Sequence, residues 1–357
     1  MWRVPALFAL ALSALGAASC GGGGGSSPSP VPVFSSTPLP HGSQTPSPSP
    51  TTSPSIPPTP TASPSPSGSP TQAPNTQQIL IVNPSANDVL TFAANASGDA
   101  VPLASVNGSD TALSNPFACA LDTAGGVYVA NQGADQVLLF TSTGNAAPAE
   151  TFTDAAAGVA FYGLAVNRVG TYALYASSRP TGTIDVFNSG GSLQRSIAGA
   201  ATTLNAPTAM AADRSGNLYV VDGATVKIFA NSAAGGNIAP TVTISGAATQ
   251  LNAPTSIALD AKGDILVGDG ASIKIFAAGS SGDAAPATVI SGLATGLQNV
   301  SGVAVDGTGG IWASDSAANA MYRFASTANG NAAPIVTIAG TNTTLSGPVC
   351  VRLGVAI

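Results

Sequence analysis

The amino-acid sequence predicts an all-β fold, a six-bladed β-propeller of four-stranded blades that the C-terminal strand closes into a ring. A 26-residue phrase at 204–229, LNAPTAMAADRSGNLYVVDGATVKIF, recurs at 251–276 as LNAPTSIALDAKGDILVGDGASIKIF. Weaker copies account for the chain from Ile79 onward. Each copy contains four short apolar runs bounded by Gly, Asp, Asn or Pro, and four strands at this period are typical of a propeller blade.

The number of blades follows from the Phe that ends the third run of each copy. In the run ATVKIF, Val226 and Ile228 alternate with Thr225 and Lys227, which is the period of a strand with two different faces. No segment of ten or more residues shows the spacing of apolar residues that a helix requires. The terminal Phe recurs six times at intervals of 42 to 48 residues, at Phe92, Phe140, Phe187, Phe229, Phe276 and Phe324.

The two ends of the repeat region predict how the ring closes. The first copy begins with ILIVN at 79–83, which corresponds to the second run of the other copies. Its missing first run is found in SGPVCVRLGVAI at 346–357. We therefore expect one blade to take its innermost strand from the C-terminus and three strands from the N-terminus. Such closure removes two sheet edges that would invite association, so we expect a monomer.

The N-terminus is typical of an exported protein. Residues 1–19 contain one positive charge, an apolar run from Val4 to Leu15 and then small residues, so they are interpreted as a signal peptide. The junction Ala17-Ala18-Ser19-Cys20 resembles the lipobox of bacterial lipoproteins. That resemblance implies cleavage before Cys20 and a diacylglyceryl group, with palmitate among its acyl chains, on the Cys20 thiol. The alternative is an ordinary signal peptide with an incidental Cys.

The segment 20–78 is predicted to be a tether between the lipid and the propeller at 79–357. Sixteen of the 28 prolines lie in 26–76, and no charged residue occurs between Val4 and Asn87. Such a segment has little to bury, and its prolines favour an extended chain that could reach on the order of 150 Å. Gly21 stands where an Asp is linked to retention in the inner membrane of lipoproteins. We therefore expect an outer-membrane or cell-surface location.

The pattern PxxIAxDxxGxLYVxD…IxxF resembles the NHL repeat of bacterial and animal propellers. The resemblance covers 79–357, is strongest in 204–250 and 251–297, and is weakest in 159–203. It implies a propeller fold and a general capacity to bind, since members of one fold differ in activity.

Enzymes related to NHL propellers include a zinc lyase and antibiotic-cleaving lyases whose mechanisms use histidine. The only histidine here, His41, lies in the tether, which removes the usual general base, the commonest zinc ligand and a Ser-His-Asp triad from the propeller. A calcium-dependent lactonase expects clustered Glu, Asn and Asp, but the only Glu is Glu150. We therefore expect no catalytic centre and no cofactor, with calcium as the one alternative.

Two sets of polar residues end apolar runs. The first set precedes xxG, where an Asp is either a turn residue or a calcium ligand, and comprises Asp122, Asp213, Asp260 and Asp306. The second set ends the second run, where it either opens a turn or lines a ligand-binding rim at one mouth of the channel. It comprises Asn83, Asn131, Asp222, Asp269 and Asp315.

Cys119 and Cys350 lie in the innermost strands of blades that we expect to be neighbours. They stand three and two residues after their prolines, and positions of opposite parity in adjacent blades face each other. An exported protein meets oxidising conditions. Two outcomes stay open, a disulfide that ties the closing blade shut or two buried thiols that point away from each other.

The charge of the propeller region argues against nucleic acid as a partner. It contains all sixteen acidic residues and nine of the ten basic ones, a net charge of −7, and no basic patch. The leading hypothesis is a tethered, non-enzymatic binding or scaffold module at the cell envelope, with a protein, a glycan or a small molecule as its ligand. The alternative is an envelope hydrolase or lyase of the NHL-like type, with or without calcium.

Overall fold

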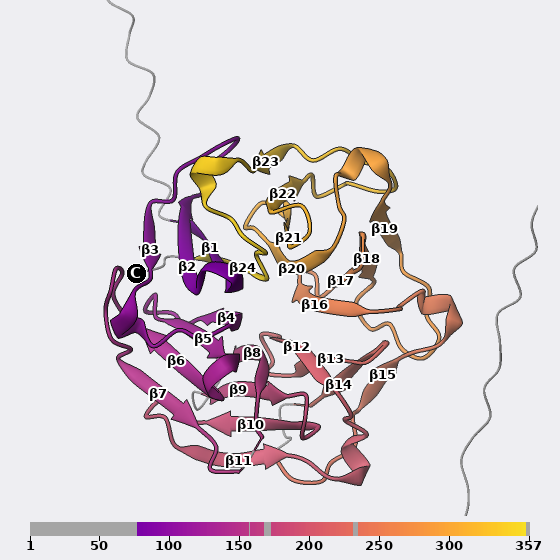
Figure 1. Cartoon of the computed structure of the whole chain (residues 1–357). Helices are drawn as coiled ribbons and strands as arrows, with labels where there is room; N and C mark the ends of the chain where they lie inside the picture. The colour runs from indigo at the N-terminus through magenta and orange to yellow at the C-terminus, as the bar shows by residue number, and fades with distance from the viewer. Residues whose placement is uncertain (1–76, 157, 168–172, 231–234, 355–357) are drawn as a thin grey trace, which may run out of the picture. The chain divides into compact units, whose positions relative to one another are not determined.

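The computed structural model describes residues 77–156, 158–167, 173–230 and 235–354, and they form a ring of six four-stranded antiparallel sheets (Figure 1). The predicted all-β, six-bladed propeller is confirmed. The signal peptide, Cys20 and nearly all of the predicted tether lie outside the described residues. Among the described residues no helix has the length and apolarity that a membrane crossing needs.

The blades are numbered 1 to 6 from the N-terminus, and the strands of each are given from the centre of the ring outward. Blade 1 contains β24 (Cys350–Gly354), β1 (Gln78–Asn83), β2 (Asp88–Ala93) and β3 (Ala104–Val106). Blade 2 contains β4 (Pro116–Leu121), β5 (Val127–Asn131), β6 (Gln136–Phe140) and β7 (Glu150–Thr153). Blade 3 contains β8 (Phe161–Asn167), β9 (Ala173–Ser178), β10 (Thr183–Phe187) and β11 (Leu193–Ile197).

The remaining three blades follow the same order. Blade 4 contains β12 (Pro207–Ala212), β13 (Leu218–Asp222), β14 (Thr225–Phe229) and β15 (Val242–Ile244). Blade 5 contains β16 (Pro254–Leu259), β17 (Ile265–Asp269), β18 (Ser272–Phe276) and β19 (Thr288–Ser291). Blade 6 contains β20 (Val300–Val305), β21 (Ile311–Asp315), β22 (Ala320–Phe324) and β23 (Val336–Ile338).

The ring closes as the ends of the repeat region predict. β24 pairs antiparallel with β1, with Cys350 opposite Val82 and Gly354 opposite Gln78. β1 begins one residue before the predicted Ile79. Blade 1 is therefore built from both ends of the repeat region, and its second strand has a hydrogen-bonded neighbour on each side.

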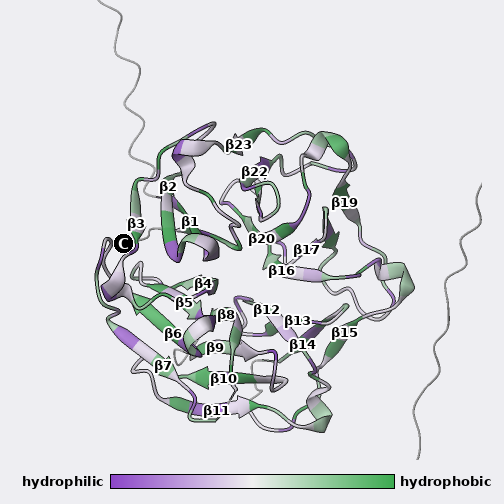
Figure 2. Cartoon of the chain, viewed as in Figure 1, coloured by the Kyte–Doolittle hydropathy of each residue, from purple (hydrophilic) through white to green (hydrophobic). Residues whose placement is uncertain are grey.

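The apolar core lies between neighbouring blades, and Figure 2 shows hydrophobic residues along the strands around the ring. One cluster joins Leu80 and Val82 of blade 1 to Leu121 and Val129 of blade 2. The six Phe residues of the repeat are at most 1% exposed. Because each sheet covers the next, closing the ring buries both faces of every blade.

Consecutive blades are also joined near the perimeter by a repeated contact that we call the clasp. One half is a Gly that opens a single 3₁₀ turn after the fourth strand; the other is an Asn or Asp in the loop that follows the third strand of the next blade. The Oδ1 atom of the Asn or Asp accepts a hydrogen bond of 2.6 to 2.8 Å from the backbone N–H of the second turn residue. The pairs are Asn145–Asp110, Asn237–Ala201, Asp283–Ala248, Asn331–Ala294 and Asp99–Asn342.

A buried Thr completes the 3₁₀ turn of each clasp. Its Oγ1 donates a 2.7 Å hydrogen bond to the carbonyl oxygen of the opening Gly and accepts one from the N–H two residues further on, as Thr249 does with Gly246 and Leu251. The turns are η2 (Ser109–Thr111), η4 (Ala200–Thr202), η5 (Ala247–Thr249), η6 (Leu293–Thr295) and η7 (Thr341–Thr343). The sequence signature is GxxTxL, in five copies.

The junction between blades 2 and 3 lacks both halves of the clasp among the residues that the structure describes. The chain after β7 has no GxxTxL signature, and β10 joins β11 through a tight turn in which the N–H of Asn188 donates to Ser192. Aromatic rings pack across this junction instead. The ring of Phe152 lies edge-on to Tyr128 of its own blade and to Phe187 of blade 3, at centroid distances of 5.6 and 5.8 Å.

Candidate functional site

The four Asp residues that end the innermost strands hold the turns that follow them. In each, Oδ1 accepts backbone N–H bonds of 2.8 to 2.9 Å from the residues two and four positions further on. These residues are Asp122, Asp213, Asp260 and Asp306. Among the described residues no group of three or more His, Cys, Asp or Glu side chains could hold a metal ion. The turn interpretation of this set therefore accounts for its geometry.

The five residues predicted to form a ligand-binding rim are buried, at 0 to 5% exposed. Each accepts backbone N–H from the loop that leads into the innermost strand of its own blade. Asn131 accepts from Ser114 at 2.6 Å, and Asp269 accepts from Ala253 at 2.7 Å. Asn83, Asp222 and Asp315 bond in the same way. These side chains fasten a loop beneath the surface, and Asp315 also accepts N–H bonds from Ala317 and Ala318 in the turn after its strand. A ligand-binding role for this set stays a prediction.

The exchange of Asn for Asp in this set has a physical reason. The amide nitrogen of Asn131 donates to the carbonyl oxygen of Ala112, the residue that follows the loop's 3₁₀ turn. Asp222 cannot donate, and the ammonium of Lys227 binds both its carboxylate and the corresponding carbonyl of Thr203. Lys274 pairs with Asp269 at 2.6 Å in blade 5. In blades 4 and 5 the buried ion pair thus replaces an amide hydrogen bond, whereas Asp315 of blade 6 forms no ion pair with a described residue.

The sixth equivalent position is Ser178 of blade 3. It pairs with Phe161 as Asp222 pairs with Pro207, and it is fully buried. Its Oγ has no hydrogen-bond partner among the described residues. Blade 3 therefore lacks the carboxylate or amide that fastens the loop in the other five blades, at the same side of the ring where the clasp is missing.

The channel of the ring is narrow and has two unlike halves. The second residues of the innermost strands are aromatic in blades 2 and 3, where Phe117 and Tyr162 pack edge-on at 5.2 Å, and carry hydroxyls in blades 4 to 6. Arg179 lies over the Tyr162 ring, 5.7 Å from its centroid. The free volume is about 30 Å³. Since one water needs on the order of 10 to 15 Å³ by this measure, the channel does not admit an organic ligand.

A much larger hollow, which we call the groove, lies across the turns of blades 4, 5 and 6. Its volume is about 1140 Å³, and the Asp213, Asp260 and Asp306 turns line it. The exposed side chains of Arg214 and Lys262 also line it, and neither forms an ion pair with a described residue. The groove is the candidate functional site because it is large enough for an organic ligand.

One carboxylate of the groove is held in a dense set of hydrogen bonds. Burial alone would raise the pKa of Asp306, but hydrogen bonds from Arg323, Thr308 and the Gly310 N–H outweigh it and hold the pKa below its usual range. The Arg323 Nε–Asp306 distance is 2.7 Å, and Trp312 Nε1 donates at 3.1 Å. This carboxylate is therefore ionised and occupied. The charges of the groove that a ligand can meet include the exposed cations Arg214 and Lys262 and the half-buried carboxylate of Asp264.

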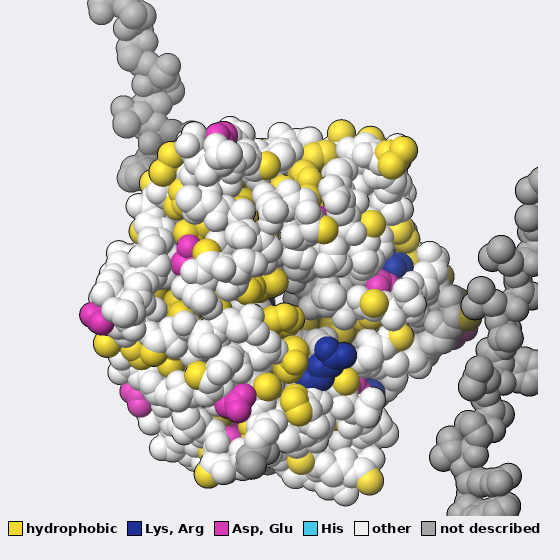
Figure 3. Space-filling model, viewed as in Figure 1, with side chains coloured by type: hydrophobic (Ala, Val, Ile, Leu, Met, Phe, Trp, Pro, Cys, Tyr) yellow, Lys and Arg dark blue, Asp and Glu magenta, His cyan; other side chains and the backbone are white. Residues whose placement is uncertain are grey.

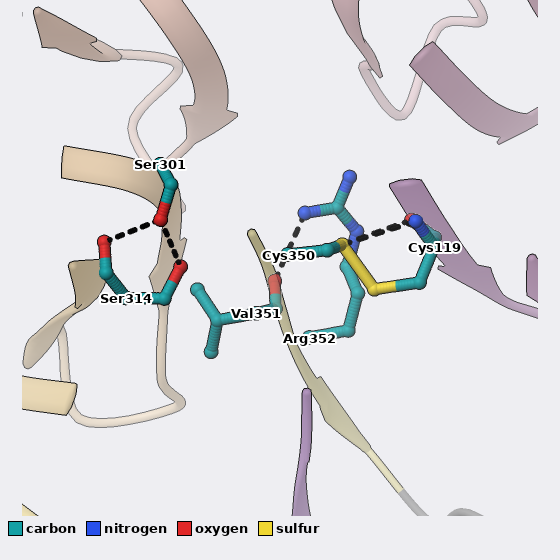
Figure 4. The surroundings of a disulfide bond; sticks show 6 residues. All are labelled: Cys119, Ser301, Ser314, Cys350, Val351 and Arg352. Atoms are coloured by element: carbon teal, nitrogen blue, oxygen red, sulfur yellow. Dashed lines mark hydrogen bonds between the residues drawn. A yellow bond between two sulfur atoms is a disulfide. The ribbon is translucent and has the colours of Figure 1, made fainter. Parts of the chain in front are cut away.

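The structure joins Cys119 of β4 and Cys350 of β24 by a disulfide, with a Cα–Cα distance of 6.0 Å (Figure 4). This is the first of the two outcomes that the sequence left open. The bond connects the closing strand of blade 1 to blade 2. On the other side of β24, Ser301 donates a hydrogen bond to the carbonyl oxygen of Pro348 in the segment that leads into it. The closing strand is thus fastened to both neighbouring blades.

The sequence-based reasoning missed the clasp. The signature GxxTxL could have revealed the clasp in the four junctions that follow chain order, because an Asn or Asp preceded by Gly stands 35 to 37 residues after its third position. The clasp escapes a search for apolar runs because its residues are small and mostly polar.

Comparisons with known proteins support the fold alone. No family model matches the chain, and no curated protein matches it. A protein of unknown function from Bacteroides caccae is 13% identical with a TM-score of 0.57, covering 78% of this chain and 98% of that one. A chain of a nidogen/laminin complex is 14% identical with a TM-score of 0.57, covering 79% and 100%.

The WD40 β-propeller domain of Doa1 is 14% identical with a TM-score of 0.50, covering 67% of this chain and 72% of that one. Likeness at this level of identity establishes a propeller and says nothing of activity. The NHL repeat and the lipoprotein signal therefore stay predictions from the sequence.

Proposed function

We propose that the chain is a binding and scaffold module of a bacterial cell envelope, exported by its signal peptide and tethered by lipid on Cys20. The tether 20–78 would hold the propeller away from an outer-membrane or cell-surface leaflet. The resemblance of AASC at 17–20 to the lipobox and the proline-rich composition of 26–76 support this arrangement. Lipid chains bind a leaflet at about 0.8 kcal/mol per buried methylene, so no spanning helix is needed.

The groove carries the proposal that the propeller binds a ligand. Its turn carboxylates accept backbone N–H bonds, while Arg214 and Lys262 are exposed and carry charge without a described partner. A protein or glycan segment, or a small molecule, that offers carboxylate groups fits these charges best. The two exposed cations are what favours an acidic ligand, since the lining of the groove also contains the carboxylates of Asp213, Asp260, Asp264 and Asp306.

A pull-down from envelope extracts tests the groove. The full chain is compared with the double variant Arg214→Ala, Lys262→Ala, and with a charge-matched control, Arg179→Ala, Arg195→Ala, whose residues lie in blade 3. We expect the groove variant to lose a partner that the full chain and the control both retain. Equal capture by all three proteins would refute the groove as the binding site.

Two further measurements test the proposed cellular location and the proposed absence of catalysis. Cys20→Ala should release the chain from the membrane fraction and abolish labelling by a palmitate analogue. Thermal unfolding with calcium and with a chelator separates the binding module from a calcium-assisted hydrolase or lyase. A large calcium-dependent rise in the melting temperature would favour the enzyme; equal melting temperatures support the binding module.

A further inference from the structure

The third residue of the third strand carries a charge in blades 3, 4 and 5, and the sign of that charge is reversed in blade 3. In blades 4 and 5 it is a Lys whose ammonium contacts the Asp that ends the second strand, as Lys227 does with Asp222. In blade 3 the same position is Asp185, and the second strand ends at Ser178. No described Lys or Arg forms an ion pair with Asp185. Blade 3 therefore has a carboxylate on the strand that carries an ammonium in the two blades that follow it.

Two buried oxygens at this place lack hydrogen-bond partners. Ser178 and Asp185 are at most 1% exposed, and neither Ser178 Oγ nor Asp185 Oδ2 has a partner among the described residues. Ser178 stands opposite Thr183, two residues before Asp185, so both side chains lie on one face of the blade. Asp185 Oδ1 is occupied, since Ser196 donates to it at 2.6 Å. Buried oxygens without partners are costly, so this place favours a ligand that binds oxygen.

A second carboxylate reaches Asp185 from blade 2. Asp154 follows β7, and its Oδ1 accepts the N–H of Ala156 at 3.0 Å. Burial raises the pKa of Asp185 to about 6, the hydrogen bond from Ser196 opposes this rise, and the charge of Asp154 and a hydrogen bond with its side chain add to it. That last hydrogen bond needs a proton, which two ionised carboxylates do not have. At neutral pH two like charges from two blades therefore face each other.

Among the described residues, the junction between these carboxylates is also the one without a backbone bridge. At the other five junctions a Gly of the following blade forms a β-bridge with the fourth strand, as Gly282 does with Ile244. No described residue bridges β7 to blade 3 in this way, and the clasp is missing there too. Figure 3 shows acidic side chains over β7 and β9 on the face drawn, and no Lys or Arg side chain over these two strands. An acidic surrounding favours a cation.

We propose that a divalent metal cation of the calcium class binds between Asp154 of blade 2 and Asp185 of blade 3, with the hydroxyl of Ser178 as a further ligand. Calcium takes six to eight oxygen ligands, from carboxylates, neutral groups and water. The cation replaces the Lys ammonium of blades 4 and 5, because an Asp side chain is shorter than Lys and supplies the opposite charge. Its two charges neutralise both carboxylates, so a repulsion between blades 2 and 3 becomes a link that fastens them.

Thermal unfolding of the full chain tests the site. Two carboxylates are few for calcium, so water completes the shell and we expect a Kd on the order of 10⁻⁴ to 10⁻³ M, the range of weak calcium sites. The chain is unfolded in calcium chloride, in a chelator, and in sodium chloride at the ionic strength of the calcium series. The melting temperature should rise saturably with calcium and not with sodium.

Two variants localise the effect. Asp185→Asn removes one charge and should lose the calcium-dependent rise, whereas the matched control Asp110→Asn, an exposed residue of another junction, should retain it. In the chelator Asp185→Asn should melt above the wild-type chain at neutral pH, because the repulsion is gone, and saturating calcium should reverse this order. Ser178→Ala should need several-fold more calcium for the same rise and should not melt lower in the chelator, since its Oγ has no described partner to lose.

Three results would each overturn the proposal. They are a wild-type chain that does not respond to calcium, an equal response to sodium at the same ionic strength, and an Asp185→Asn variant that responds as Asp110→Asn does. Should Asp185→Asn fail to fold, crystals of the wild-type chain soaked in terbium chloride decide. An anomalous peak between Asp154 and Asp185 supports the site, and its absence overturns it.

The site and the groove can be tested separately, because the groove lies across blades 4, 5 and 6. A chain that binds no partner in the groove can still bind the cation between blades 2 and 3. A calcium-dependent rise that Asp185→Asn removes belongs to this site. A rise that the variant keeps contradicts the site and favours the calcium-assisted enzyme.

Discussion

The carboxylate of Asp283 in blade 5 accepts a 2.7 Å hydrogen bond from the backbone N–H of Ala248 in the segment that leaves blade 4. The bond caps an otherwise unpaired donor at the start of a 3₁₀ turn, as an N-cap residue does in a helix. We expect Asp283→Ala to lower the free energy of unfolding by about 1 to 2 kcal/mol. Urea unfolding measures it, with the exposed neighbour Ser281→Ala as control; equal losses would contradict the clasp.

Gly246 must be glycine for two reasons. Its φ is +124°, and a Cβ there would lie 2.4 Å from the carboxyl carbon of Asp283. Gly282, in the same clasp, has φ +60° and open space around its Cβ position. We expect Gly246→Ala to cost more than Gly282→Ala, by about 1 kcal/mol or more, since only the first combines strain with a collision. Comparable urea midpoints for the two variants would show that the collision is relieved.

The disulfide closes a loop across almost the whole ring, since its cysteines are 231 residues apart. Replacing Cys119 and Cys350 by Ala should lower the free energy of unfolding by about 2 to 4 kcal/mol. A reductant should lower the melting temperature of the wild-type chain and leave that of the double variant unchanged. Mass spectrometry must show that both thiols have been freed; an unchanged wild-type melting temperature would then count against this role.

The closing strand should be essential for cooperative folding. Val351 is fully buried between blades 1 and 6, and β24 covers one edge of β1. A chain that ends at Ser346 should lose the single sharp thermal transition of the whole chain. Adding a peptide with the sequence 347–357 should restore part of it; a truncated chain that melts as sharply and as hot as the intact one would disprove closure by this strand.

Asp185 in blade 3 should make stability depend on pH. Burial raises its pKa to about 6, the hydrogen bond from Ser196 opposes this, and the charge of Asp154 adds to it. In the unfolded chain the pKa is about 3.9. Between these two pH values the folded chain therefore binds more protons than the unfolded chain. The contribution of Asp185 to the free energy of unfolding falls as the pH rises through that window.

Asp185→Asn keeps an acceptor for Ser196 and cannot ionise. It should be more stable than the wild-type chain at neutral pH, by about 1 kcal/mol, and equally stable near pH 4. Urea unfolding at both pH values measures it, with Asp110→Asn as an exposed control for loss of one charge. A variant that is destabilised equally at both pH values would show that the carboxyl acts through packing alone.

The ring and its closure could be predicted from the sequence because they follow from the order of apolar runs, which is local information. The same holds for Asp213 and its equivalents, since an Asp before xxG bonds amides close by in the chain. For the set that ends the second strands, the sequence left a turn role and a rim role open, because most of its partners are not local: Asp222 reaches Ala206 sixteen residues away. Whether such a polar group is exposed depends on how the preceding loop folds back, which no periodicity reveals.

The groove lay beyond prediction for a related reason. Asp213, Asp260 and Asp306 were each interpretable as turn residues, but a hollow depends on how far the turns of neighbouring blades stand apart. The periodicity of the sequence predicts where these residues lie along the chain, but it does not predict the size or shape of the hollow between them.

The clasp has a consequence for how such a gene can change. Each joint within the chain takes one half from a repeat and the other half from the next, 35 to 37 residues later. An in-frame duplication of one repeat copies one Gly-containing turn and one Asn or Asp of the clasp. The added blade can therefore form a clasp with the blade before it and with the blade after it. The number of blades can then change without new kinds of contact, except at the junction between blades 2 and 3, where the described residues form no clasp.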